Sequence, residues 1–245
     1  MSAKLLHNFI SILLSESAKT VADAQSENLA LYVGARSHSN LLVLYNPDKI
    51  LKSLRFYKKT GSLDFVQEPI TGMMCLNDTF DNKHCPAWNA YEVTVVAAQK
   101  GWGPLLFDIA MTEFETLMID RSGQVSVEAR NLWRYYLDSR NDVEKLRLDD
   151  YYHPRTKNTK DDTRKLYNPD TKNNFMNYAF RAKSRLDVSS LKKNHEELTQ
   201  SAKKINSKID IESFLEAKAN SYFSDKYSNV SEKDKYVPDR GLLKK

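Results

Sequence analysis

A glycine turn between an apolar strand and a helix is the feature of this sequence that most constrains its fold. The strand is expected over residues 93–97, the turn contains Gly101 and Gly103, and a helix follows over about 104–115. Proline suits the start of that helix, at Pro104, because its missing N–H would have no partner there. Such a turn directs several backbone N–H groups at one point, where the helix dipole adds positive potential. The sequence therefore predicts a site for a phosphate-bearing cofactor.

Other apolar runs in the first 150 residues predict a mixed α/β (α+β) domain over 1–150. Ser126 is expected to cap a helix that ends near 138–141, because its hydroxyl can accept from an amide in the first turn. We expect a central sheet flanked by helices. Strands are predicted over 29–33, 41–45, 63–66, 70–76, 93–97 and 117–119, and the other helices over 3–14, 47–57 and 104–115.

The last third of the chain is expected to be a basic, partly irregular extension over 151–245. Residues 148–174 show almost no apolar periodicity. From Asp187 onward, apolar residues recur at three- and four-residue steps, which predicts one long helix near 187–222. This helix either packs on the domain or pairs with a partner helix or a second copy, and about the last twenty residues are expected to form a tail. The face in question carries Val188, Leu191, Leu198 and Ile205.

Charge divides the chain unevenly. Residues 1–149 hold 16 Lys and Arg against 18 Asp and Glu, whereas residues 150–245 hold 21 against 14, which gives net charges of −2 and +7. The basic third is either a solvated lysine-rich face or a surface for an anionic partner such as nucleic acid.

The two cysteines, Cys75 and Cys85, argue against a disulfide-rich secreted protein. No Cys/His set has zinc spacing, so no metal site is predicted, and the apolar run at 3–14 is too short to span a bilayer.

Two segments carry a resemblance to a known family. The turn Gln99-Lys-Gly-Trp-Gly-Pro104 resembles motif A of the GCN5-related N-acetyltransferases, whose usual form is Gln/Arg-x-x-Gly-x-Gly/Ala. Gly101 and Gly103 match its two small positions, whereas Ala98 occupies the Gln/Arg position. The segment from Ser126 to Trp133 has the spacing of the family's Asn-x-x-Ala-x-x-Leu-Tyr helix, with Ser for Asn and Trp for Tyr. Together with neighbouring matches over about 75–150, these segments look like a divergent acetyltransferase-like group from tailed bacteriophages.

The resemblance implies acetyl-CoA, or another acyl-CoA, as cofactor. Backbone amides in the turn would hold the diphosphate of CoA, and the preceding strand would lie beside the pantetheine arm. The cofactor-binding residues implied in this way are Val95, Ala97, Lys100, Gly101, Trp102, Gly103 and Leu105. Trp102 itself is either exposed for stacking or folded back onto the domain.

The catalytic residues are less well defined. The family's tyrosine is thought to protonate the departing thiolate, and the indole of Trp133 cannot do so. Tyr136, farther along the same helix, and Glu92, in the strand before the turn, are the candidate catalytic residues, with Asp108 as a second candidate base.

Three functions remain open from the sequence. The first is an acyl-CoA-dependent N-acyltransferase that acts on an unidentified amine. The second is a catalytically degenerate acetyltransferase-like module that serves as a phage virion or interaction protein. The third is a binder of anionic surfaces through the basic third. The first two place the protein in the host cytoplasm or the phage virion.

Overall fold

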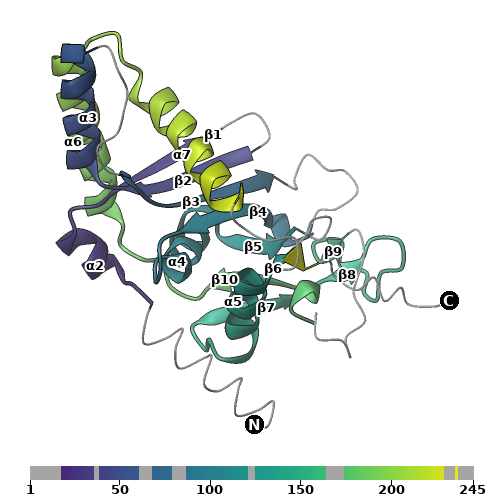
Figure 1. Cartoon of the computed structure of the whole chain (residues 1–245). Helices are drawn as coiled ribbons and strands as arrows, with labels where there is room; N and C mark the ends of the chain where they lie inside the picture. Colours follow the sequence, from purple (N-terminus) through teal and green to yellow (C-terminus); the bar gives the residue numbers. More distant parts are fainter. Residues whose placement is uncertain are drawn as a thin grey trace, which may run out of the picture.

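This computed structural model describes residues 18–35, 39–60, 68–78, 87–120, 125–163, 174–228 and 235–236. A seven-stranded mixed sheet runs through the molecule, with helices on both of its faces (Figure 1). In spatial order its strands are β1 (Ala30–Ala35), β2 (Ser39–Tyr45), β3 (Ile70–Asp78), β4 (Tyr91–Ala98), β5 (Thr116–Ile119), β10 (Tyr178–Ala182) and β7 (Val143–Arg147). The fold class is therefore α/β, as the sequence predicts.

The one parallel pairing in this sheet, among the residues described, joins β4 to β5. The chain between these strands forms α4 (Gly103–Phe114), which carries it back to the same end of the sheet. The parallel ladder covers only 91–93 and 117–119. A bulge lies next to it, since Cys75 of β3 pairs with Val95 whereas Leu76 pairs with Val93. The second half of β4 thus continues without β5 beside it.

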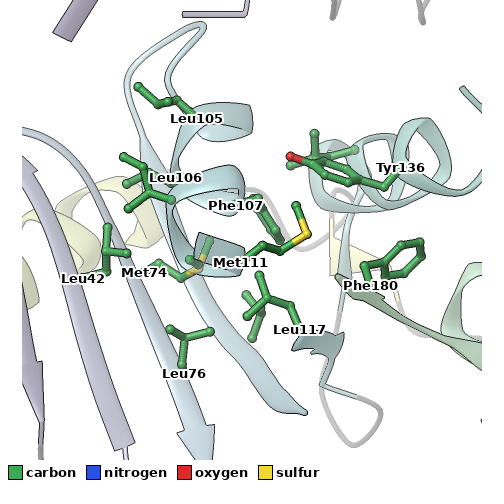
Figure 2. Packing of buried hydrophobic residues seen from close by; sticks show 14 of the residues in the cluster. Leu42, Met74, Leu76, Leu105, Leu106, Phe107, Met111, Leu117, Tyr136 and Phe180 are labelled. Carbon is green, nitrogen blue, oxygen red and sulfur yellow. The ribbon is translucent and has the colours of Figure 1, made fainter. Parts of the chain in front are cut away.

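One face of the sheet is covered by α4 and by α5 (Val127–Asp138). Figure 2 shows Leu106, Phe107 and Met111 of α4 above Met74 and Leu117 of the sheet. All five side chains are buried. The burial of most α4 side chains explains why its sequence is apolar on nearly all sides.

Gly72 of β3 allows α4 to approach the sheet closely. A Cβ at this position would lie 2.7 Å from Cδ1 of Leu106 and 3.2 Å from Cβ of Ala98. Because Leu106 is completely buried, it has little freedom to move away. Glycine at position 72 therefore allows the short distance between α4 and the sheet, and this distance sets the position of the turn that precedes α4.

The other face of the sheet is covered by α3 (Pro47–Thr60), α6 (Ser189–Ile205) and α7 (Ile211–Ser228). In Figure 1, α3 and α6 lie side by side, and α7 crosses in front of the strands. Ile50, Leu198 and Leu215 contribute one buried side chain from each of the three helices. The remaining short elements are α2 (Val21–Ser26), η1 (Ala87–Asn89), β6 (Val125–Ser126), β8 (Asp149–Asp150), β9 (Asp162–Thr163), η2 (Asn174–Asn177) and β11 (Lys235–Tyr236).

Residues beyond 150 belong to the same fold, which corrects the predicted division of the chain. Strand β10 lies between β5 and β7 and pairs antiparallel with both. Without it, the sheet would end at β5 and β7 would lose its partner. The chain after residue 150 thus completes the central sheet and covers one of its faces, and it is not an appendage to a finished domain.

The single long helix predicted near 187–222 is wrong, because the chain breaks into α6 and α7. Asp210 accepts hydrogen bonds from the amides of Glu212 (3.1 Å) and Ser213 (3.4 Å), so it caps the start of α7. Of the two arrangements left open for the face of this helix, the structure shows packing within the chain. Val188, Leu191 and Leu198 are buried here, and Ile205 packs against the apolar cluster that contains Leu198.

Most other predicted elements are confirmed with small shifts of their ends. Ser126 caps α5 as expected, since its hydroxyl accepts from the amide of Ala129 at 3.2 Å. The predicted helix over 3–14, the predicted strand over 63–66 and most of the tail lie outside the described residues. Among the residues described, no helix is both long and apolar enough to span a membrane.

Candidate functional site

A cavity of about 360 Å³ opens where β4 leaves β5. Its volume lies within the range of small-molecule sites. The cavity is bounded by the middle of β4, the end of β5 with Asp120, β6, the first half of α5, and one residue each of α4 and α7. Its lining residues are Val93, Thr94, Val95, Val96, Phe107, Ile119, Asp120, Val125, Ser126, Ala129, Trp133 and Phe223.

The cavity exists because the parallel ladder stops at Val93. The amide of Asp120 donates to the Val93 carbonyl at 3.3 Å, and no later residue of β4 pairs with β5. Backbone groups on this edge of residues 94–98 therefore have no strand partner within the described part of the chain. A crevice outside the carboxyl ends of neighbouring parallel strands is a common ligand site in α/β folds.

The cavity wall is mainly apolar, with three polar side chains. The hydroxyl of Thr94 donates to the Cys75 carbonyl (3.3 Å), and the hydroxyl of Ser126 is engaged as the cap of α5. Asp120 is the only carboxylate among the described lining residues. A mainly apolar wall with a few placed polar groups is typical of a small-molecule site.

The glycine turn lies at the carboxyl end of β4, directly before α4. Three hydrogen bonds hold it in place. The amide of Trp102 donates to the Gln99 carbonyl (3.1 Å), the Gln99 amide donates to the Thr71 carbonyl (2.9 Å), and the Gln99 side chain donates to the Ile70 carbonyl (2.9 Å). Gly101 has φ = 87°, a conformation that favours glycine. The turn is thus anchored to β3 and positioned before a ligand binds.

Four amides in and just after this turn have no acceptor within the described part of the chain. They belong to Lys100, Gly101, Gly103 and Leu105. A Cβ built on Gly103 would meet no atom within 4 Å, so open space lies in front of this residue. Unpaired amides at the start of a twelve-residue helix favour an anion.

Lys19 adds a positive charge beside the turn, and sequence reasoning missed it. Its amide donates to the Gly101 carbonyl at 3.0 Å, and its Nζ lies 5.4 Å from the centre of the Trp102 ring. The same ammonium group pairs with Glu27 at 3.3 Å. No local pattern marks Lys19 as part of the site, because it reaches the turn only through the folding of a distant segment.

The predicted cofactor residues form two groups: some lie at the cavity or in the turn, and the others have side chains buried in the core. Val95 lines the cavity, and Lys100, Gly101 and Gly103 form the turn. Trp102 is only 3% exposed and packs in the core, so it is folded back and cannot stack on a ligand. The side chains of Ala97 and Leu105 are also buried, so these residues can contact a cofactor only through their backbones. Ala97 packs on the α7 side of the sheet and Leu105 in the α4 core.

Tyr136 does not line the cavity. It therefore cannot donate a proton directly to a ligand there. Its side chain is completely buried. The hydroxyl donates to Oδ1 of Asp108 (2.5 Å) and lies 3.2 Å from the Pro104 carbonyl oxygen. Burial, followed by the nearby Asp108 charge, raises the pKa of Tyr136 well above its usual value. Trp133, one turn earlier on α5, forms the cavity wall instead.

The two candidate bases also lie away from the cavity wall. Asp108 accepts from Tyr136 and from Arg140 (3.2 Å), and burial raises the pKa of its carboxyl group. Glu92 lies in β4, opposite Asn77 and Met118, and does not line the cavity. Asp120 is therefore the acidic group best placed for chemistry in the cavity.

Comparisons with known proteins give no relative. No protein-family model matches the chain, and no curated protein or solved structure matches it either.

Proposed function

We propose that this protein binds an acyl-CoA and transfers the acyl group to an amine, as the GCN5-related N-acetyltransferases do. The observation that carries the proposal is a set of four amides in and just after an anchored turn that have no acceptor among the described residues. The turn ends a strand whose edge beside the cavity has no strand partner in the same part of the chain. The resemblance in sequence covers the same segments. The fold, a mixed sheet flanked by helices, is compatible with that family's layout.

The cofactor would lie along the second half of β4. The amides of Lys100, Gly101 and Gly103 would hold its diphosphate, with Lys19 adding a cation nearby. The pantetheine arm would enter the cavity and pair with the β4 edge that β5 leaves free. At about 360 Å³, the cavity has room for this arm and the thioester, while the adenosine would remain outside.

The reaction would form a C–N bond and break the C–S bond of the thioester. A backbone amide near Val95 would donate to the carbonyl oxygen as negative charge develops on it. Asp120 would accept the proton that the attacking amine loses, because it is the carboxylate on the cavity wall. The CoA thiolate would leave without a protein acid, since Trp133 stands where a phenol would be needed.

The second candidate, a degenerate module that binds CoA without chemistry, rests on Trp133. Its indole is buried between Phe107 and Phe180, with ring centres 5.0 and 5.1 Å away. This position gives Trp133 a structural role in the core that does not depend on proton transfer. In this case the cavity serves recognition alone, in a virion or interaction protein.

Calorimetry with acetyl-CoA tests binding, and a matched pair of variants locates it. Gly103→Glu and Gly103→Gln add side chains of similar size into the open space, but only Glu adds a negative charge. We expect Gly103→Glu to weaken binding at least tenfold more than Gly103→Gln, because a carboxylate repels the diphosphate. If the wild-type protein does not bind acetyl-CoA, both candidate functions fail.

Release of free thiol from acetyl-CoA, in the presence of a panel of small amines and amine-bearing peptides, separates the two candidates. Amine-dependent release supports the transferase. Saturable binding without release supports the degenerate module.

A further inference from the structure

Three aspartates gather where β8 and β9 meet, far along the chain from the glycine turn. Asp149 is 4% exposed, Asp161 7% and Asp162 6%. One carboxylate oxygen from each lies within 4.8 Å of the other two. Asp149 and Asp162 are opposite each other in the parallel β8–β9 pair, and the Asp149 amide donates to the Asp161 carbonyl at 2.6 Å. Backbone pairing therefore holds the three side chains together.

The hydrogen bonds on this cluster leave it incomplete. The Thr156 amide donates to Oδ2 of Asp149 (2.7 Å), and the Thr156 hydroxyl lies 3.2 and 3.3 Å from the two carboxylate oxygens of Asp161. Asp162 differs from its neighbours, because its Oδ1 is buried and has no hydrogen-bond partner. A buried carboxylate oxygen without a donor is costly, so a native structure requires something to satisfy it.

The charge on the cluster also has no basic partner in the part of the chain that the structure describes. Within the described ranges, no lysine, arginine or histidine forms an ion pair with any of the three carboxylates. Negative charges this close in a buried place are stable only when a cation or a proton joins them.

We propose that Asp149, Asp161 and Asp162 bind a divalent cation, and that Ca²⁺ fits best. Carboxylate oxygens are the ligands that Ca²⁺ prefers. At a Ca–O distance of about 2.4 Å, two ligands of one ion lie at most about 4.8 Å apart, so three oxygens that all lie within 4.8 Å of one another can share it. Mg²⁺ demands near-ideal octahedral geometry and usually keeps several waters, whereas Ca²⁺ accepts irregular sets of oxygen ligands, so a cluster of three carboxylates favours Ca²⁺.

The cation would fasten an irregular loop to the sheet. The cluster closes the loop 151–160, whose Lys160 carbonyl accepts from the Trp88 amide of η1. Beneath it lie Leu146, Leu148 and Ala179, which form a small apolar cluster with η1. The side chains of this loop are almost all exposed, so packing stabilises it little. A bound ion would stabilise the position of the loop instead.

Calorimetric titration of the chelator-treated full-length protein with CaCl₂ tests the proposal directly. We expect one saturable site per chain, with weaker binding of MgCl₂. Asp162→Asn keeps the shape of the side chain but removes a ligand charge, so we expect it to weaken Ca²⁺ binding by about tenfold or more. Asp150→Asn is the control, because Asp150 directly follows Asp149 in β8 but lies outside the cluster, and it should change the affinity by less than about threefold.

Thermal unfolding with and without CaCl₂ distinguishes a variant that loses a Ca²⁺ ligand from one that is merely destabilised. Without the ion, Asp162→Asn and Asp161→Asn should melt at or above the wild-type temperature, because each relieves repulsion. With CaCl₂, the wild-type melting temperature should rise and that of these two variants should not. Absence of saturable Ca²⁺ binding to the wild-type protein at about 1 mM overturns the proposal, as does an equal loss of affinity in Asp150→Asn and Asp162→Asn.

Discussion

The hydroxyl of Tyr136 donates to the carboxylate of Asp108 at 2.5 Å, which ties α5 to α4 inside the core. Arg140 reaches the same carboxylate at 3.2 Å and also pairs with Asp142 at 2.6 Å. Burial raises the pKa of Asp108, and these two donors oppose the rise. The hydrogen bond between Tyr136 and Asp108 joins α5 to α4, the two helices that border the candidate site. It therefore stabilises the relative position of these helices.

Tyr136→Phe should therefore destabilise the protein by about 1–3 kcal/mol, because Asp108 loses a buried donor. Tyr135→Phe is the matched control, since it removes a hydroxyl from the adjacent, half-buried residue. Chemical denaturation of both variants measures the difference in the free energy of unfolding. Equal stability of Tyr136→Phe and the wild-type protein would show that Arg140 alone satisfies the carboxylate.

Stability should also depend on pH through His195. Its Nδ1 lies 2.7 Å from the Tyr45 hydroxyl, and burial lowers its pKa below the usual 6.5, against the opposing effect of Glu212 and Glu196. Below pH 6.5 the unfolded chain thus binds more protons at this position than the native state does. The contribution of His195 to stability is complete above pH 6.5 and is lost as the pH falls through the lowered pKa.

His195→Gln should flatten this part of the acid-side loss of stability, because glutamine does not titrate. The denaturation midpoint, measured from pH 8 to pH 5, checks the slope. His153→Gln, which removes an exposed histidine, should keep the wild-type slope. A wild-type slope in His195→Gln would mean that other groups cause the loss.

Two glycines should respond in opposite ways to substitution by alanine. In Gly72→Ala, the new Cβ meets the buried Leu106 at 2.7 Å, so we expect a loss of about 1–3 kcal/mol. In Gly103→Ala, it meets nothing within 4 Å, so we expect no loss, or a gain of up to about 1 kcal/mol. Thermal unfolding of both variants measures the contrast. Similar melting temperatures for the two would contradict the close approach of α4 to β3.

Local patterns in the sequence predicted the elements on which the candidate site is built. Short apolar runs mark the strands, and the Ser126 cap and the glycine turn mark the starts of two helices, because each signal depends on neighbouring residues. The insertion of β10 between β5 and β7 was not predicted, since strand pairing over such sequence distances leaves no local trace. Lys19 was missed for the same reason.

The break between α6 and α7 and the aspartate cluster were missed for different reasons. The apolar steps continue through Ile205 and Ile209, so periodicity alone could not reveal that Asp210 starts a new helix. The pairs Asp149-Asp150 and Asp161-Asp162 stand at the two ends of a polar stretch that resembles an ordinary loop. Only the β8–β9 pairing brings three of these carboxylates together.

The tryptophan in the cavity wall gives the sharpest test of the chemistry. If a missing acid limits the proposed transfer, Trp133→Tyr should raise the rate of amine-dependent thiol release, because it places a phenol on the wall of the cavity that would hold the thioester. General acids contribute about 10²–10⁴-fold when well placed, so even a poorly placed phenol should give about a tenfold gain in kcat.

Trp133→Phe is the control, because it makes nearly the same cavity without a hydroxyl. Both variants lose ring contacts with Phe107 and Phe180, so each should lose about 1–3 kcal/mol of stability, and their affinities for acetyl-CoA should agree. Comparison of the two thus separates proton donation from a change in cavity volume. Equal rates for the two variants would show that proton supply to the thiolate does not limit turnover, and binding without turnover in both would favour the degenerate module.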